Sequence, residues 1–229
     1  FRPNTNEELI FVDYRAEFIQ FMVRSGVLTF GDFTTKSGRK TPYFVNTGNY
    51  KTGAQAAKLG DYYAACIQEH MPDGITCLFG PAYKGIPLAV SAAASLYRNY
   101  DRDLPYCFNR KEAKDHGEGG NIVGYKPQDG DRVIIIEDVI TAGTAIRETM
   151  PVLKGCADVK VTDMFISVNR CEVGQNPDKT AVMEVGEEFG IKVHALVTVQ
   201  DIREYLADKE EYAHLLPLMD AYMKQYCVF

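Results

Sequence analysis

The amino-acid sequence predicts an α/β fold with a mostly parallel central sheet flanked by helices. Short apolar segments rich in β-branched residues alternate with helical segments along most of the chain, which is typical of a parallel sheet covered on both faces. Residues 27–50 differ, because glycine and proline interrupt aromatic and β-branched residues there, and this pattern indicates short strands and turns. A chain of 229 residues has the length of one generous domain. We therefore expect a single domain over 1–229, in which 27–50 forms a small irregular addition.

The order of the elements follows from the spacing of the apolar residues. The first helix is expected from Glu7 to Arg24, with Gly26 as its stop. The later helices are expected at 54–70, 86–98, 144–154 and 202–225. The strands are expected at 75–80, 104–109, 132–138, 159–168 and 191–199, and RVIIIED (132–138) is the clearest of them.

Composition and charge exclude several classes of protein. Apolar residues make up 46% of the chain and charged residues 24%, values that exclude collagen-like and disordered chains. The formal net charge is −6 and no apolar run approaches the roughly 20 residues that span a bilayer, so neither nucleic acid nor a membrane is an expected partner. The six cysteines form no CxxC pair and no zinc-like spacing with histidine. We therefore expect reduced thiols in a cytoplasmic protein.

The segment that follows the clearest strand carries the chemistry. Ligands of open α/β sheets bind beyond the carboxyl ends of the strands, and this strand ends in Glu137 and Asp138, followed by VITAGTA. Two adjacent carboxylates can accept hydrogen bonds from vicinal hydroxyls. A glycine-containing turn at a helix start can bind a phosphate with its backbone N–H groups and the helix dipole, helped here by the hydroxyls of Thr141 and Thr144. The segment therefore predicts a sugar-phosphate site, whereas ATP P-loop and dinucleotide motifs are absent from the sequence.

The run IIIEDVITAGTA resembles the signature with which type I phosphoribosyltransferases bind 5-phosphoribosyl 1-pyrophosphate (PRPP). Four further segments, which lie in the same order as in the family, narrow the resemblance to the orotate phosphoribosyltransferases. They are FTTKSGRKTPYF (33–44), FGPAYKGIPLA (79–89), FNRKEAKDHGEGGNIVG (108–124) and SVNRCE (167–172). They resemble, in turn, the N-terminal hood over orotate, the pyrophosphate-binding turn, the mobile catalytic loop and the site of an orotate-binding arginine.

The resemblance implies a fold, a reaction and an assembly. The fold would be that of type I phosphoribosyltransferases, with residues 27–50 in the hood and 110–121 as the mobile catalytic loop. The reaction would transfer 5-phosphoribosyl from PRPP to orotate, giving orotidine 5′-monophosphate and pyrophosphate in de novo pyrimidine (UMP) biosynthesis. Mg²⁺ would be the cofactor, held mainly through PRPP and without certain protein ligands. The expected assembly is a homodimer with shared active sites.

The resemblance also assigns residues to the PRPP site. Lys114 is expected to be the main catalytic cation, and Asp138 is the second residue expected to be catalytic. The expected PRPP-binding residues are Lys36, Tyr83, Lys84, Arg110, Lys111, Lys114, His116, Glu137, Asp138, Val139, Ile140, Thr141, Ala142, Gly143, Thr144 and Ala145.

Orotate would be bound by Phe44, Val45, Thr141 and Arg170. Arg170 can pair with the orotate carboxylate, and the Phe44 ring would pack against the base. The sequence departs from the family pattern in three places. Val45 stands where a second phenylalanine is frequent, and Asn169 and Cys171 stand where aspartate and glutamine are expected.

Two other functions fit parts of the sequence. The PRPP signature alone also suits a phosphoribosyltransferase for another base, but the hood and the KEAKDHGEGG loop favour orotate. A PRPP-sensing regulator that binds RNA or DNA could keep the phosphate loop and lose catalysis. The cations of the catalytic loop and the negative net charge argue against that regulator.

Overall fold

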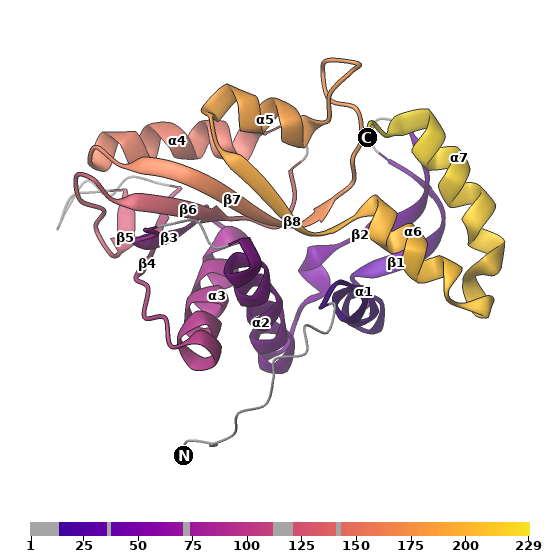
Figure 1. The fold of residues 1–229 in the computed structure, drawn as a ribbon, viewed down its shortest axis with the longest axis horizontal. Coiled ribbons are helices and arrows are strands. Elements are labelled where there is room, and N and C mark those ends of the chain that lie inside the picture. The colour runs from indigo at the N-terminus through magenta and orange to yellow at the C-terminus, as the bar shows by residue number, and fades with distance from the viewer. Residues whose placement is uncertain (1–13, 36–37, 71–73, 112–120, 141–142) are drawn as a thin grey trace.

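A computed structural model describes the chain except for residues 1–13, 36–37, 71–73, 112–120 and 141–142 (Figure 1). Its central sheet has six strands in the order β5-β4-β3-β6-β7-β8. All neighbouring pairs are parallel except β4 and β5. The strands are β3 (Cys77–Gly80), β4 (Tyr106–Asn109), β5 (Ile122–Gly124), β6 (Arg132–Ile136), β7 (Lys160–Asn169) and β8 (Lys192–Thr198). The structure confirms the predicted fold class.

Helices cover both faces of this sheet (Figure 1). Helices α2 (Gly53–His70) and α3 (Gly85–Tyr100) lie on one face, and α4 (Thr144–Cys156) and α5 (Ala181–Phe189) lie on the other. Side chains of a strand alternate between faces, so Ile134 packs into the core under α2 and α3, whereas Ile135 packs into the core under α4. β6 is thus buried on both sides, which explains its continuous apolar run.

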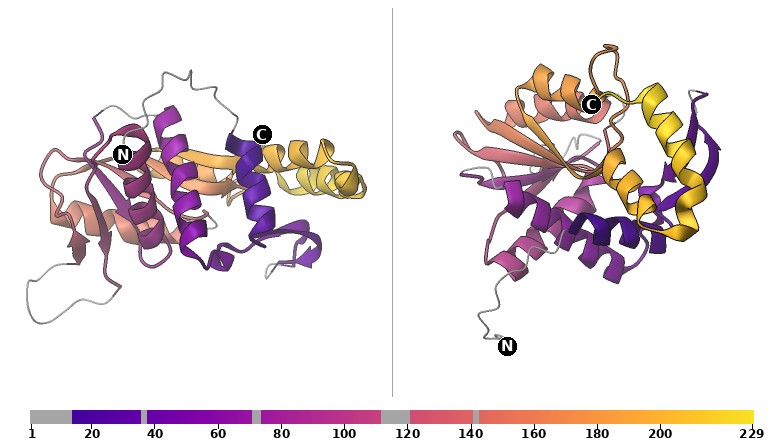
Figure 2. Two further views of the ribbon diagram at one scale, coloured as in Figure 1. Left: turned by 90° about the horizontal axis from the view of Figure 1, so that it is seen from below. Right: turned by 45° about the vertical axis from the view of Figure 1, so that its right-hand side comes forward.

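A second layer of structure stands at one end of the sheet. It contains α1 (Tyr14–Arg24), the antiparallel hairpin of β1 (Leu28–Thr34) and β2 (Lys40–Val45), and the 3₁₀ turn η1 (Thr47–Asn49). The chain returns to it with α6 (Val199–Ala207), the 3₁₀ turn η2 (Glu210–Leu215) and α7 (Leu216–Tyr226). Figure 2 shows α7 running beside the hairpin, and Tyr43 of β2 meets Tyr222 of α7 in an edge-to-face ring contact.

Most predicted elements occur near their predicted positions. The clearest strand ends at Ile136, so Glu137 and Asp138 lie just beyond it. The C-terminal segment is divided into α6, η2 and α7, where a single helix over 202–225 was expected. Pro217 lies in the first turn of α7, a position that suits proline because the N–H it lacks would have no helical partner. Residues 7–13 of the first expected helix lie outside the described residues.

Two elements were not predicted. The strand β5 has three residues, too few to show a periodic pattern. Helix α5 does carry sequence signals, because Thr180 caps its N-terminus by accepting from Met183 N, and Gly190 ends it in the left-handed region. Among the described helices, none is long and apolar enough to cross a membrane.

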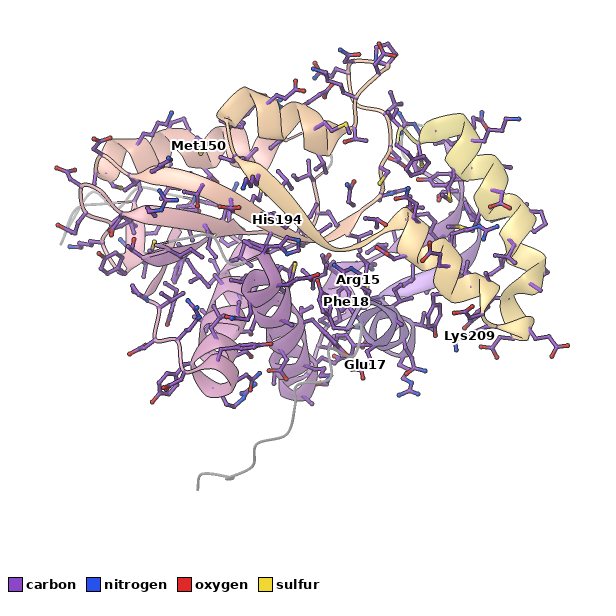
Figure 3. All side chains as sticks on the ribbon, in the orientation of Figure 1. Arg15, Glu17, Phe18, Met150, His194 and Lys209 are labelled. Atoms are coloured by element: carbon purple, nitrogen blue, oxygen red, sulfur yellow. The ribbon has the colours of Figure 1, made fainter. Side chains whose placement is uncertain are left out.

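Three histidines without a motif can be placed in this fold. His194, labelled in Figure 3, lies on β8 with its Nε2 2.7 Å from Asp163 Oδ1, and its ring centroid is 4.3 Å from that of His70. Burial lowers the pKa of His194 despite the hydrogen bond to Asp163. His214 lies in η2. His70 and His194 thus make contacts within the fold, away from the carboxyl ends of the strands, whereas His214 is exposed.

Close packing of α2 against α3 yields a test of the fold. A Cβ atom on Gly60 would come within 2.5 Å of the Ser91 carbonyl oxygen, a backbone atom that cannot move alone. We expect Gly60→Ala to lower the free energy of unfolding by about 1–3 kcal/mol. The matched control is Gly155→Ala in α4, where nothing lies within 4 Å and the better helix propensity of alanine should add about 0.5–1 kcal/mol. Urea titration measures both, and equal stability of Gly60→Ala and wild type would contradict the packing argument.

Candidate active site

The centre of the site is the point where the chain leaves β6. The backbone there is held by its neighbours: Glu137 N donates to Phe165 O at 2.9 Å, and Ser167 N donates to Asp138 O at 2.8 Å. The Ser167 hydroxyl donates to the same Asp138 oxygen at 2.7 Å, and the Tyr63 hydroxyl of α2 donates to Glu137 O at 2.7 Å. These bonds fix where the two acidic side chains begin.

The Asp138 carboxylate joins three segments of the chain. Its Oδ2 accepts from Lys84 Nζ at 2.9 Å and from the Thr47 hydroxyl at 2.8 Å, and Lys84 Nζ also lies 3.2 Å from that hydroxyl. Its Oδ1 accepts from Val139 N at 2.7 Å. Burial works against the charge of Asp138, but the hydrogen bonds from Lys84 and Thr47 outweigh it and lower the pKa. Asp138 is therefore a buried, ionised acceptor at the carboxyl end of β6.

Glu137 has a different electrostatic character. Its side chain is buried, and its Oε1 accepts from Asp138 N at 2.9 Å. Burial, with a contribution from the neighbouring Asp138 charge, raises the pKa of Glu137 to about 7. Adjacent carboxylates interact strongly when water is excluded, so at neutral pH the pair carries less than two full negative charges.

The turn after β3 brings Lys84 to this point. The peptide bond between Ala82 and Tyr83 is cis, and Ala82 N donates to Asn109 Oδ1 of β4 at 2.9 Å. Gly85 must be glycine, because a Cβ there would come within 2.8 Å of the Ile136 carbonyl oxygen and 2.6 Å of Pro81 Cδ. The close approach of this turn to the end of β6 places Lys84 beside Asp138. Tyr83 stays largely exposed at the rim of the site.

The segment that follows β6, from Glu137 to Gly143, is the predicted phosphate-binding segment and is called the phosphate loop below. It ends at Gly143, the N-cap residue of α4. Gly143 has φ +72°, and its helix start has no side-chain cap, so the first N–H groups of α4 are left for another acceptor. A cavity of about 480 Å³ opens in front of this helix start. Its lining includes Tyr83, Lys84, Lys111, Glu137, Asp138, Val139, Ile140, Gly143, Thr144 and Ala145. The structure thus brings together ten of the predicted PRPP-binding residues around one cavity.

The predicted catalytic loop, residues 110–121, is described only at its two ends, at 110–111 and at Asn121. Arg110 N donates to Asn121 O at 2.7 Å, which closes the base of the loop. Lys111 Nζ lies 3.1 Å from Glu148 Oε2 of α4, at the edge of the cavity. Five predicted site residues lie outside the described residues, and their roles stay predictions: Lys36, Lys114, His116, Thr141 and Ala142.

Arg170 follows β7 and turns toward the hood. Its Nη2 lies 2.9 Å from Glu172 Oε1 and 3.4 Å from the Tyr222 hydroxyl, and its guanidinium sits 5.3 Å from the centroid of the Tyr43 ring. The departures beside it build the turn, because Asn169 Oδ1 accepts from Cys171 N at 2.9 Å, and Cys171 has φ +52°. Asn169 therefore stabilises the backbone bend that aims Arg170.

Phe44 and Val45 lie on the hood hairpin. Phe44 is 44% exposed, and its ring contacts that of Phe33 at 5.8 Å, while Val45 pairs with Leu28 across the hairpin. The cavity that Arg170 lines is bounded on the hood side by Arg39. The structure thus does not gather Phe44, Val45 and Arg170 around that cavity, and their contact with a base stays a prediction.

Sequence reasoning missed Thr47, Arg39 and Glu172. Thr47 contacts Asp138, 91 residues away, and Arg39 contacts Glu172, 133 residues away. The only local signal for Thr47 was the turn motif around it, since Asn46 Oδ1 accepts from Gly48 N. That signal indicates a turn but not its partner.

Comparisons with known proteins agree with this geometry. Residues 46–202 match the model of the phosphoribosyl transferase domain family. The chain is 53% identical over 219 residues to an orotate phosphoribosyltransferase of Clostridium beijerinckii, covering 93% of this chain and 97% of that protein. It is 51% identical over 215 residues to one of Pseudomonas syringae, covering 93% and 98%.

Its fold also resembles the crystal structure of an orotate phosphoribosyltransferase of Francisella tularensis. The TM-score is 0.82 at 38% identity, over 92% of this chain and 99% of that one. With an acidic strand end, a lysine turn and an uncapped helix start around one cavity, the chain belongs to the phosphoribosyltransferase domain family and, within it, to the orotate phosphoribosyltransferases.

Proposed function

We propose that the protein transfers the 5-phosphoribosyl group from PRPP to orotate, giving orotidine 5′-monophosphate and pyrophosphate in de novo pyrimidine (UMP) biosynthesis. The observation that carries the proposal is the ionised Asp138 beside Lys84, in front of the uncapped start of α4. This arrangement offers acceptors for a ribose diol and donors for phosphate in one cavity. Relatives of 53% and 51% sequence identity that are named orotate phosphoribosyltransferase support the choice of orotate as the base.

The ribose would bind by exchanging partners at Asp138. Ribose hydroxyls that donate to Asp138 would compete with Lys84 and Thr47, which donate to Oδ2 of the same carboxylate. The Lys84 ammonium is then free to turn toward the oxygens of the pyrophosphate. Binding of the sugar thus makes a cation available for the leaving group.

The reaction needs positive charge around the leaving pyrophosphate. The anomeric carbon becomes oxocarbenium-like as its bond to pyrophosphate breaks, and negative charge grows on the departing oxygens. Fixed cations near those oxygens stabilise that transition state. Lys84 and Lys111 line the cavity, and the family assigns the same task to Lys114 and His116.

Mg²⁺ is the cofactor that the family implies. Among the residues that the structure describes, no group of three or more His, Cys, Asp or Glu side chains could hold a metal ion. Two carboxylates beside a polyphosphate substrate nevertheless suit Mg²⁺, which in such sites keeps few protein ligands and many substrate or water oxygens. When bound, the ion would neutralise pyrophosphate charge, and Asp138 and Glu137 would accept hydrogen bonds from ribose hydroxyls or from water molecules bound to the ion.

We further propose a cytoplasmic homodimer in which each catalytic loop closes over the neighbour's site. The six cysteines are free thiols, as suits a reducing compartment. A two-fold dimer makes the sharing reciprocal, since each subunit gives what it receives.

A substrate panel tests the proposed reaction. Release of pyrophosphate on mixing protein, PRPP and Mg²⁺ should require orotate and should not occur with uracil or hypoxanthine. Orotate differs from uracil by the carboxylate that Arg170 is proposed to pair with. Turnover of either neutral base without turnover of orotate would assign the protein to another substrate, and PRPP binding without turnover of any base would favour a regulator.

Asp138→Asn tests the ribose contact. The substitution keeps the shape and removes the charge that ribose hydroxyls would meet. The loss should be about 1.5–3 kcal/mol, seen as a KM for PRPP raised roughly tenfold to hundredfold, with a smaller effect on orotate. The matched control is Asp131→Asn, at the other end of β6, where the carboxylate accepts from the Tyr125 hydroxyl and Gln128 N. That control should lower stability and leave the KM for PRPP unchanged, and an unchanged KM in Asp138→Asn would remove Asp138 from the site.

Subunit mixing tests the shared site. Lys114→Ala lacks the main loop cation and Arg170→Ala lacks the proposed base contact, so each homodimer should be nearly inactive. If the loop acts across the interface, one of the two sites of a mixed dimer has an intact loop and an intact body. Equal random mixing should then restore about a quarter of the wild-type activity. If subunit exchange is verified by mass and no activity returns, the loop acts on its own subunit.

A further inference from the structure

A second cavity, of about 380 Å³, adjoins the phosphate loop on the side of the hood. Ile140, Asn169 and Arg170 line it at the carboxyl ends of β6 and β7, and Arg39 lines it from the hood. Its charged lining residues are three arginines and two glutamates: Arg39, Arg147, Arg170, Glu172 and Glu184. The formal sum is +3 − 2 = +1, so the cavity favours an anionic ligand.

The excess positive charge of this cavity comes from three side chains, those of Arg39, Arg170 and Glu172. Glu172 is shared by two guanidinium groups, with its Oε2 3.2 Å from Arg39 Nη1 and its Oε1 2.9 Å from Arg170 Nη2. The hydroxyl of Tyr222 also donates to Glu172. One carboxylate cannot balance two guanidinium groups, so the trio of Arg39, Arg170 and Glu172 carries a net charge of +1.

The other charged side chains of the lining have partners elsewhere. Arg147 Nη2 lies 2.6 Å from Glu188 Oε2. Glu184 Oε1 accepts from Asn176 N at 2.6 Å. The charges of Arg147 and Glu184 cancel in the sum of the lining, so the excess charge of the lining is that of the trio.

Arg170 also holds a donor without an acceptor. Its Nε is buried and makes no hydrogen bond among the described residues. The trio is partly shielded from water, with side-chain exposures of 31% for Arg39, 25% for Arg170 and 22% for Glu172. Aromatic rings hold both guanidinium groups in place, Tyr226 at 5.5 Å from Arg39 and Tyr43 at 5.3 Å from Arg170. Surplus positive charge that is partly shielded from water suits a ligand carboxylate.

We propose that Arg39 determines the preference for a base that carries a carboxylate. It shares the negative charge of Glu172, which would otherwise cancel the charge of Arg170, and so leaves a net positive charge beside Arg170 that attracts the carboxylate of the base. Arg39 is thus a specificity-determining residue that acts through Glu172 and Arg170. The inference rests on the proposed use of orotate and adds to it a residue from the hood.

Product binding isolates the carboxylate. Orotidine 5′-monophosphate and uridine 5′-monophosphate differ only in that group, so calorimetric affinities for the two give a preference ratio without any turnover. Arg39→Gln should reduce the ratio about tenfold, because the trio then sums to zero and a partly shielded charge pair is lost. Arg39→Lys keeps the charge and should hold the ratio within about threefold of wild type.

Two further variants separate charge from structure. Lys40→Gln removes the same charge from the next residue, but Lys40 is 68% exposed and faces Asp32 at 3.4 Å, so the ratio should not change. The double variant Arg39→Gln with Glu172→Gln restores the sum of the trio to +1 and should recover most of the preference, which a merely structural role for Arg39 does not predict. Thermal unfolding of each variant shows that it is folded.

The outcomes separate the inference from the proposed function. A wild-type protein that binds both nucleotides equally and does not turn over orotate would overturn the proposed function. A wild-type preference for orotidine 5′-monophosphate that persists in Arg39→Gln would overturn only the role of Arg39. A double variant whose preference ratio stays as low as that of Arg39→Gln would also overturn the role of Arg39.

Discussion

The carboxylate of Asp138, shared by Lys84 and Thr47, is the interaction on which the arrangement of the site depends. Asp138 begins the phosphate loop, Lys84 ends the turn after β3, and Thr47 belongs to the hood. Three segments far apart in sequence therefore meet at one oxygen atom. A charge-assisted hydrogen bond is strong enough to fix such a meeting and remains exchangeable by a competing hydroxyl. The same contact can thus organise the site and still be exchanged for a hydroxyl of a bound sugar.

Glu172 repeats this principle at the proposed base site. It joins Arg39 of the hood, Arg170 after β7 and Tyr222 of α7. The carboxylates of Asp138 and Glu172 differ in the charge that remains for a ligand. At Asp138 the acid is the group proposed to meet the ligand, whereas Glu172 is shared by two guanidinium groups, which leaves net positive charge at the proposed base site. Residues of the hood contact both carboxylates, since Thr47 donates to Asp138 and Arg39 pairs with Glu172.

The sequence groups correctly the residues that are contiguous in the chain. The apolar run of β6, the acids after it and the glycine before α4 are contiguous, so their pattern predicts a sugar-phosphate site, and a cavity lies there. The sequence does not group distant partners, because nothing near Thr47 or Arg39 indicates Asp138 or Glu172. The three residues of β5 were too few to show a period, and the caps of α5 at Thr180 and Gly190 were a readable signal that was not used. The C-terminal segment also carries a local signal of its division, because Pro217 suits the first turn of a helix.

The hairpin of the hood has a consequence for the order of folding. Its buried residues Leu28 and Tyr43 share a core with Met219 and Tyr222 of α7. Nearly the whole chain separates the two sides of that core, so its contacts close a very long loop, and such contacts form late. The central sheet can pair its strands before α7 docks, but the hairpin lacks one wall until α7 is in place. The hairpin that the family resemblance assigns to the hood is therefore expected to be completed late in folding.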